Sequence, residues 1–240
     1  MSKYRSAVPF SQRKIFTLLF LACLSAAFSL SFRTSIVMKK LAEGTIEFSV
    51  IPVDTAKNKP SFTIPDKMVM KFKNNYFSCE EECGLGMAKM KFITDPVKKE
   101  FRTAIIFFEK KQSVLDTAGI RQFNYYLPDY DVEYGKKTKE ISGYKCRNAI
   151  LKFKNGDPSY EVWFTKEIAI EHPNWANPYY KIDGVLLDYR LRKFGLDLHY
   201  TANTVSEAHI DDSYFTIPAD YKVTPHADIV KMFEGFYSGE

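Results

Sequence analysis

Strict alternation of apolar and polar side chains is the feature that most restricts the fold of this chain. In residues 45–50, Ile46, Phe48 and Val50 would share one face of a strand, with polar side chains between them. The same period of two recurs in residues 67–73, 88–93, 149–154 and 160–165. A strand of this kind has one apolar face and one wet face, so the sheet that it joins must curl over a core.

Short turns such as residues 155–158 separate these strands, and no regular alternation of strand with helix occurs. The high aromatic content of 15% also favours strands. Near the end, Ile229, Met232, Phe233 and Phe236 recur at helical spacing. We therefore predict a mainly β fold: a curved antiparallel sheet, or half-barrel, of roughly nine to eleven strands with a few helices in or beside its concavity.

The amino-terminal segment is typical of an export signal. A basic stretch ends at Lys14, residues 15–32 are uncharged, and small residues at 25–27 offer a cleavage site. A retained anchor is the alternative, because eighteen uncharged residues just suffice to span a bilayer. Lipidation at Cys23 is a third reading. We expect residues 1–31 to be a signal peptide or retained anchor and 32–240 to be a single β-rich domain, exported to the periplasm or outer membrane of the cell envelope.

The charge distribution argues against nucleic-acid binding. The net charge of +5 depends on Lys3, Arg5, Arg13 and Lys14, because without residues 1–31 there remain 30 basic and 29 acidic side chains. A nucleic-acid-binding protein normally concentrates basic residues on one face. We expect no nucleic-acid partner.

No strong catalytic or metal-binding motif is present. The sequence lacks G-x-S-x-G, H-E-x-x-H and P-loop patterns, and its histidines stand apart. Glu207, His209 and Asp211 could share a strand face, but no second histidine accompanies them. The segment CEEEC, residues 79–83, mixes hard and soft ligands. We expect no metal, no cofactor and no enzymatic activity.

The cysteines leave the disulfide pattern open. Without Cys23, the odd set of Cys79, Cys83 and Cys146 remains. On an extended strand Cys79 and Cys83 would lie about 13 Å apart, too far to bond, so they could pair only across a turn. Cys146 lacks a nearby histidine in the sequence, which favours a packed strand residue over a nucleophile.

Residues 138–146 (TKEISGYKC), followed by residues 161–168 (EVWFTKEI), resemble the GLPGLI and DUF4412 families of uncharacterised bacterial envelope proteins. The segment 181–189 keeps a Gly-x-Leu but lacks the Leu-Pro that precedes the glycine in these families. Residues 215–221 (FTIPADY) also match the F-x-I-P-x-x-Y pattern at the end of these families. The residues that match the family motifs are Lys139, Ile141, Gly143, Tyr144, Cys146, Trp163, Gly184, Phe215, Pro218 and Tyr221.

These families are similar to periplasmic lipoprotein carriers, and the resemblance implies an apolar ligand, such as an acyl chain or a lipidated protein, in the concavity. The apolar strand positions that we predict to line such a site are Met68, Met70, Phe72, Met90, Phe92, Tyr160, Val162 and Phe164. The alternative is a structural or interaction module of the envelope without a ligand cavity. Its outer face would be cationic toward a membrane surface through Lys71, Lys73, Lys89, Lys91, Lys152 and Lys154.

Overall fold

The structure is a computed structural model that describes residues 40–53, 64–123 and 127–238, with side chains up to residue 235. The compact unit to which they belong spans Lys39–Glu240. The predicted signal segment, residues 1–31, and Cys23 lie outside the described residues. Within the described ranges, no helix is long and apolar enough to cross a membrane.

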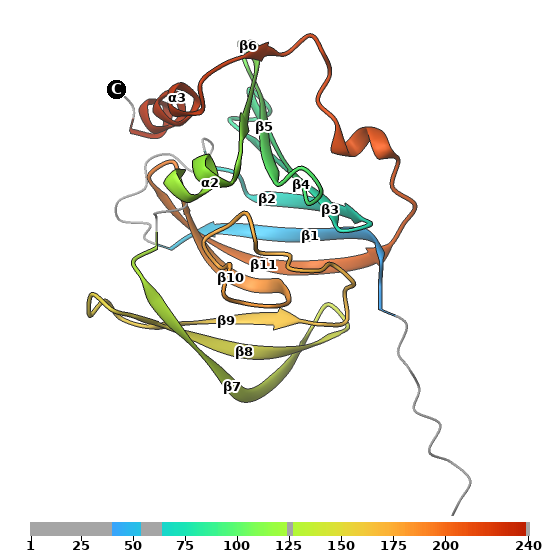
Figure 1. Cartoon of the computed structure of the whole chain (residues 1–240), viewed down its shortest axis with the longest axis vertical. Coiled ribbons are helices and arrows are strands. Elements are labelled where there is room, and N and C mark those ends of the chain that lie inside the picture. Colours follow the sequence, from blue (N-terminus) through green and yellow to red (C-terminus); the bar gives the residue numbers. More distant parts are fainter. Residues whose placement is uncertain (1–39, 54–63, 124–126, 239–240) are drawn as a thin grey trace, which may run out of the picture. The chain divides into compact units, whose positions relative to one another are not determined.

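The described residues form one open sheet in the order β12-β6-β5-β4-β3-β2-β1-β11-β10-β9-β8-β7 (Figure 1). The strands of its first half are β1 (Glu43–Pro52), β2 (Lys67–Lys73), β3 (Tyr76–Cys83), β4 (Ala88–Asp95), β5 (Glu100–Phe107) and β6 (Glu109–Leu115). Those of its second half are β7 (Tyr130–Ile141), β8 (Tyr144–Phe153), β9 (Tyr160–Thr165), β10 (Val185–Lys193) and β11 (Leu196–Glu207). The two-residue strand β12 (Lys222–Val223) pairs in parallel with β6, and the other neighbours are antiparallel.

The prediction of a mainly β fold with a curved antiparallel sheet is confirmed. Strands β2 to β6 form one meander and strands β7 to β11 form a second, and β1 joins them by pairing with both β2 and β11. Because β6 and β7 lie near opposite edges of the sheet, the chain between them must cross one of its faces. The sheet has one strand more than the largest number predicted, since β12 is too short to show a period.

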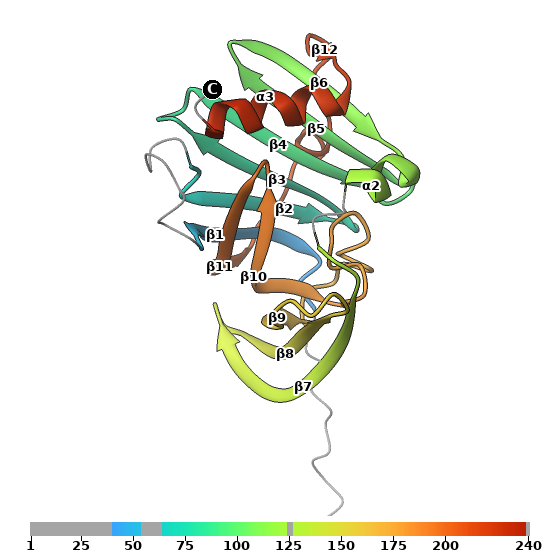
Figure 2. The same cartoon turned by 90° about the vertical axis from the view of Figure 1, so that its left-hand side faces the viewer.

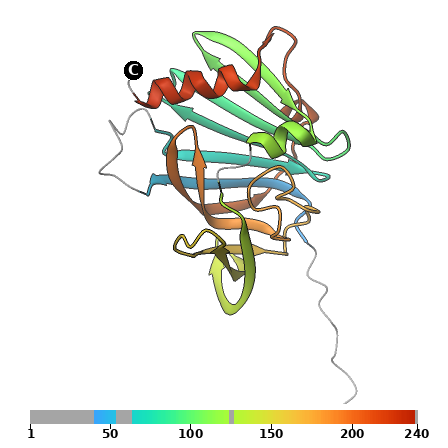
Figure 3. The same ribbon diagram turned by 60° about the vertical axis from the view of Figure 1, so that its left-hand side comes forward.

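Helices α2 (Thr117–Phe123) and α3 (His226–Ser238) lie on the same face of the sheet, which we call the inner face (Figures 2 and 3). Ile229, Val230 and Phe233 of α3 pack with Met90 and other inner-face side chains of β4 and β5. The helical spacing of the carboxyl-terminal segment therefore correctly predicted a helix. The 3₁₀ helix η2 (Asp212–Phe215) lies on the opposite, outer face, where Phe215 packs in a cluster with Ile93.

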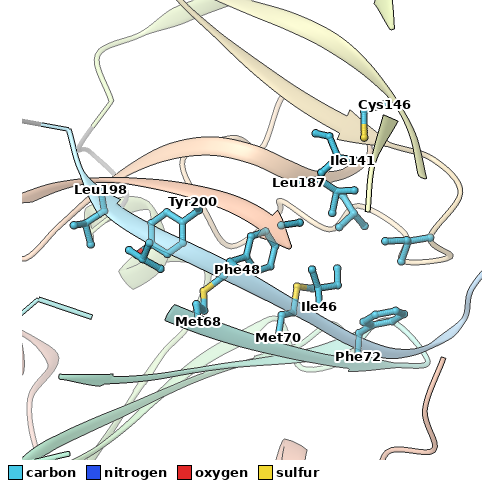
Figure 4. Close-up of a cluster of buried hydrophobic side chains, with 14 of the residues drawn as sticks. Ile46, Phe48, Met68, Met70, Phe72, Ile141, Cys146, Leu187, Leu198 and Tyr200 are labelled. Atoms are coloured by element: carbon cyan, nitrogen blue, oxygen red, sulfur yellow. The ribbon is translucent and has the colours of Figure 1, made fainter. Parts of the chain in front are cut away.

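The alternation of side chains matches the burial of the strands. In β2, Met68, Met70 and Phe72 are buried while the intervening side chains are not. They join Phe48, Leu198 and Tyr200 in the largest apolar cluster, which holds β1, β2 and β11 together (Figure 4). Each such side chain contributes roughly 1.5–3 kcal/mol through its burial. The alternation of apolar and polar residues thus correctly predicted both the strands and the side of each strand that faces the core.

The lysine-rich residues 135–141 lie between two strand-like segments, and their sequence predicts a polar connection with a bend at Gly143. The structure corrects this prediction, because β7 continues through them to Ile141 and the turn is confined to Ser142 and Gly143. Both turn residues have a positive φ, of 52° and 82°, which the hairpin requires. The register of β7 against β8 shifts between Tyr134 and Thr138, which marks a β-bulge. Gly135 lies within this bulge, where a Cβ would lie 2.1 Å from Oδ1 of Asn148, so a larger residue does not fit.

Candidate functional site

A pocket of about 180 Å³ lies on the inner face and is the candidate binding site. Its walls come from β1 to β6, from β10, from the segment 173–179 and from both helices. Ile120 and Phe123 of α2 and Val230 of α3 supply its helical side. The pocket lies between these helices, the segment 173–179 and the inner face of the sheet.

The pocket wall contains apolar side chains that keep accessible surface although they point into the inner face. They are Phe77, Cys79, Phe101, Phe123, Tyr189 and Leu191, all of which are only partly buried. A fully packed core would cover such groups, since protein interiors normally reach the density of organic crystals. Exposed apolar surface gathered in a hollow is a common mark of a ligand site.

One wall of the pocket carries a buried charge. The side chain of Glu81, on β3, is only 1% exposed, and its Oε1 accepts a hydrogen bond of 3.0 Å from the hydroxyl of Tyr200. Its Oε2 accepts a hydrogen bond from Nζ of Lys193, at the end of β10. Burial raises the pKa of Tyr200 well above its usual value, and the charge of Glu81 adds to this effect. Tyr200 therefore remains a donor to the carboxylate.

Lys193 reaches Glu81 because the hairpin of β10 and β11 brings its tip close to β3, β4 and α3. Nζ of Lys193 lies 4.6 Å from the ring centroid of Phe92, and the neighbouring Phe194 stacks on Phe233 at 4.9 Å. A buried ion pair of this kind recovers its desolvation cost only when further hydrogen bonds satisfy the charges. Placing one in a wall otherwise lined by aromatic and aliphatic groups gives the pocket a polar end.

The loop that closes the pocket is held by its own asparagines. Nδ2 of Asn174 donates to the carbonyl oxygens of Ile182 and Gly184 at 2.8 and 2.9 Å. Asn177 donates to Oδ1 of Asn174 at 3.0 Å. The side-chain amides of both asparagines thus form hydrogen bonds within the loop. Oδ1 of Asn177 also accepts from the backbone N–H of Tyr179, whose buried side chain is hydrogen-bonded to Tyr160. The loop therefore forms one wall of the site and is held by its own hydrogen bonds.

The predicted lining residues divide between the pocket and the packed core. Met68, Met70 and Phe92 line the pocket. The structure places Phe72 in the cluster of β1 and β2, Met90 against α3, and Tyr160, Val162 and Phe164 in the cluster of β8 and β9. These five share the inward phase of their strands, but other parts of the chain cover them. Residues of α3 pack with Met90, Tyr179 and Ile182 pack in the cluster of β8 and β9, and Ile168 and Ile170 belong to the cluster of Phe72.

The residues of the family motifs are spread over the fold. Lys139 on β7 pairs with Asp188 on β10 at 2.7 Å and lies 4.3 Å from the ring centroid of Trp163 on β9. His199 on β11 contacts the other oxygen of Asp188 at 2.7 Å. Burial alone would raise the pKa of Asp188, but the hydrogen bonds from Lys139 and His199 hold it below its usual value. This cluster links β7, β9, β10 and β11.

The remaining motif residues occupy turns and crossings. Gly143 forms the β7–β8 turn, next to Ile141 and Tyr144. At Gly184, a Cβ would come within 2.4 Å of Cδ2 of Phe164, so a larger residue does not fit. Phe215 and the exposed Pro218 belong to the segment that crosses the outer face, and the carbonyl oxygen of Tyr221 accepts a hydrogen bond from Gln112 of β6. In the described part of the chain, none of the motif residues is among the pocket lining.

The three described cysteines form no disulfide with one another. Cys79 and Cys83 lie on the continuous strand β3, so the turn that would let them pair is absent there. Cys146 is buried near Ile141 and Leu187 (Figure 4), and burial raises its pKa to about 11. Its thiol therefore stays protonated at neutral pH, as expected for a packing residue and unlike an activated nucleophile.

The weak metal candidates do not converge. Glu207 ends β11, His209 contacts Glu43 at 3.1 Å, and the carboxylate of Asp211 caps η2. Over the described ranges, no group of three or more His, Cys, Asp or Glu side chains is placed to hold a metal ion.

The lysines of the outer strand faces are engaged with carboxylates and one aromatic ring. The pairs are Lys73 with Asp212, Lys89 with Glu82, Lys91 with Glu80, Lys152 with Glu133 and Lys154 with Asp129, while Lys71 lies over the ring of Tyr214. Partnered charges of alternating sign give a mixed surface.

Sequence reasoning missed the polar end of the pocket. Glu81 stands between Cys79 and Cys83 on the inward phase of β3, so the period of two already placed a carboxylate inside. That signal was available. Its partner Lys193 was not predictable, because it lies 112 residues away and reaches β3 only through the curvature of the β10–β11 hairpin.

Comparison with solved structures supports the fold. Two structures of PNGF-II, in space groups C2 and P21, are similar to the chain with TM-scores of 0.51 and 0.50. Their sequence identities are 14% and 13%, over 80% and 79% of this chain. The chain spans about one third of the PNGF-II chain, 33% in each case. At this identity the likeness concerns the fold alone.

No family model matches the sequence. No curated protein matches it either.

Proposed function

We propose that this chain is an exported, non-enzymatic protein of the cell envelope that binds an apolar group in its inner-face pocket. The observation that carries the proposal is the half-buried apolar wall of that pocket, formed by Phe77, Cys79, Phe101, Phe123, Tyr189 and Leu191. Covering this surface with a ligand removes it from water, which is favourable by roughly 25 cal/mol for each Å².

The size of the pocket restricts the ligand. Its volume of about 180 Å³ is slightly above that of a cavity of roughly 150 Å³ that accepts benzene. It therefore suits the end of an acyl chain, from a free lipid or from a lipidated protein, with the rest of the ligand outside. The resemblance to the GLPGLI and DUF4412 families and the signal-like residues 1–31 support a place in the envelope.

A structural or interaction module that leaves the pocket empty is the second candidate. The observation in its favour is also the volume, because ligand pockets commonly measure about 300–1,000 Å³. The two functions differ in whether a medium-chain amphiphile binds to the purified protein.

The test is isothermal titration calorimetry of the full chain with decanol and with decanoate. Binding of either, with the negative heat-capacity change of apolar burial, supports the proposal. Cys79→Phe narrows the pocket and should abolish binding, and Leu191→Trp is a second filling variant in case the first is unstable. Val97→Phe, at a site that is 78% exposed and outside the pocket lining, is the matched control and should bind normally. If neither ligand binds to the folded wild type, the pocket is structural only.

A further inference from the structure

The charges that face the pocket cancel one another. Glu81 and Lys193 are the charged lining residues on the inward phase of their strands, and Nζ of Lys193 donates to Oε2 of Glu81. Arg192 also borders the pocket, but it lies on the exposed, outward phase of β10, opposite Asp197 in the ladder with β11. In the part of the lining that the structure describes, the inward side chains therefore add no net charge to the hollow.

The titratable groups of the lining do not change this balance near neutral pH. Burial lowers the pKa of His226 to about 4, and its Nδ1 lies 2.9 Å from Oγ of Ser113. Burial raises the pKa of Cys79 to about 12 and the pKa values of Tyr179 and Tyr189 well above their usual range. An ionised ligand would therefore lose its hydration in the pocket without meeting an unmatched opposite charge.

The ion pair still has hydrogen bonds to offer to a ligand. An ammonium group has three N–H donors, and Lys193 uses one of them on Glu81. The side chain of Lys193 is 15% exposed, whereas Glu81 is 1% exposed and already accepts from both Tyr200 and Lys193. Lys193 is thus the accessible member of the pair. An uncharged oxygen can accept from it and leave the balance of charges as it is.

The pocket has room for such an oxygen together with part of its carbon chain. Its volume of about 180 Å³ exceeds the roughly 150 Å³ of a cavity that accepts benzene. A chain of about six carbons that ends in an oxygen is only slightly larger than benzene, so it fits inside. Beside the oxygen, the apolar wall of the pocket would cover the carbons.

We propose that the part of the ligand inside the pocket carries an uncharged oxygen, a hydroxyl or a carbonyl, which accepts a hydrogen bond from Lys193. This inference rests on the proposed function, because it names the polar group of the ligand for the same pocket. Alcohols and esters have this chemistry. A carboxylate would compete with Glu81 for Lys193, and an ammonium group would compete with Lys193 for Glu81.

NMR titration of the full chain at pH 7.5 with 1-hexanol, hexanoate and hexylammonium tests the polar group. Hexanol should bind about tenfold more tightly than either ion, because the ions lose more hydration than the pocket returns. Glu81→Gln leaves Lys193 as an unmatched cation, so hexanoate should become the tightest of the three ligands. Glu80→Gln, on the outer phase of the same strand and paired with Lys91, is the matched control and should keep the order of the wild type.

Lys193→Gln is the second variant, in case Glu81→Gln does not fold. It removes the cation and leaves Glu81 as an unmatched carboxylate at the same end of the pocket. Hexylammonium should then become the tightest of the three ligands, which reverses the change expected for Glu81→Gln.

The outcomes separate the two proposals. Equal affinity of the wild type for the three ligands, or a preference for one of the ions, overturns this inference but leaves apolar binding intact. An unchanged order of affinities in the folded charge variants also overturns it. Binding of decanol without binding of hexanol would place the polar group outside the pocket and contradict the inference alone. If decanol and decanoate fail to bind as well, the pocket function itself is overturned, and with it this inference.

Discussion

Glu81 is a carboxylate at an inward position of β3, and the rest of the site follows from how it is satisfied. It is 1% exposed, accepts from Tyr200 and Lys193, and faces an otherwise apolar hollow. The ring of Tyr200 is in turn fixed by stacking on Tyr189 at 5.1 Å between centroids. A single inward charge thus organises side chains from β3, β10 and β11.

Removing Lys193 alone should lower the stability of the fold more than removing both Lys193 and Glu81. Lys193→Met leaves a buried carboxylate with only Tyr200 and should lower the free energy of unfolding by about 3 kcal/mol. The double variant Glu81→Met with Lys193→Met should lie close to the wild type. Urea denaturation of the three proteins gives the comparison. If the double variant is as unstable as Lys193→Met alone, the charge of Glu81 is not the cause.

The described thiols should react slowly in the folded protein. Burial, with a smaller effect of Glu81, raises the pKa of Cys79 to about 12, and burial raises that of Cys146 to about 11. At pH 8 only about one thiol in a thousand would be ionised at Cys146. In a chain with Cys23→Ser, Ellman's reagent should show no fast phase until denaturant is added. A rapid stoichiometric reaction of Cys146 would restore it as a candidate nucleophile.

The turn between β3 and β4 contains a conformational cost at one residue. Leu85 is 95% exposed and has a φ of 54°, a region that disfavours most side chains but tolerates asparagine. Leu85→Asn should therefore raise the free energy of unfolding by about 0.5–1 kcal/mol. Thermal denaturation measures the shift, with Val97→Asn at another exposed site as the control. An unchanged or lower midpoint for Leu85→Asn would contradict the assignment of strain.

At the scale of elements, period-two patterning predicted the strands because each strand lies over a core on one side only. It failed at residues 135–141 because β7 is an edge strand that is exposed along most of its length, so its side chains carry no alternation. The helix α3 was predictable from Ile229 and Phe233, which face the sheet at helical spacing. Neither pattern states which face of the sheet a helix will cover.

The docking of α3 should depend on pH through His226 at its first turn. Because burial lowers the folded-state pKa of His226 to about 4, only the unfolded chain gains this proton as pH falls from 6.5. Its contribution to stability is complete above about pH 6.5 and is lost progressively down to about pH 4, by up to about 3 kcal/mol. His226→Gln should flatten the stability profile in this window. His209→Gln, at a largely exposed site, is the control and should leave the slope as in the wild type.

At the scale of the whole molecule, the class of fold was predictable and the site was only partly so. Composition, patterning and turns led to a curved antiparallel sheet, which the structure confirms. The pocket arises from pairings far apart in sequence: β1 with β11, the hairpin tip with β3, and α2 crossing between the sheet edges. No local pattern encodes these contacts, so Lys193 could not be predicted to reach the pocket. The period of two that places Met68, Met70 and Phe92 in the pocket lining also places Glu81 on the inward face of β3.

The proposed binding of an apolar group is tested most directly by native mass spectrometry of the full chain, purified from its own envelope without added lipid. We predict a bound species that is released on unfolding, has the mass of an acyl amphiphile, and is absent from the pocket-filling variant Cys79→Phe but present on Val97→Phe. A folded protein that carries no such species, and that also remains empty after incubation with decanoate and decanol, would contradict the account.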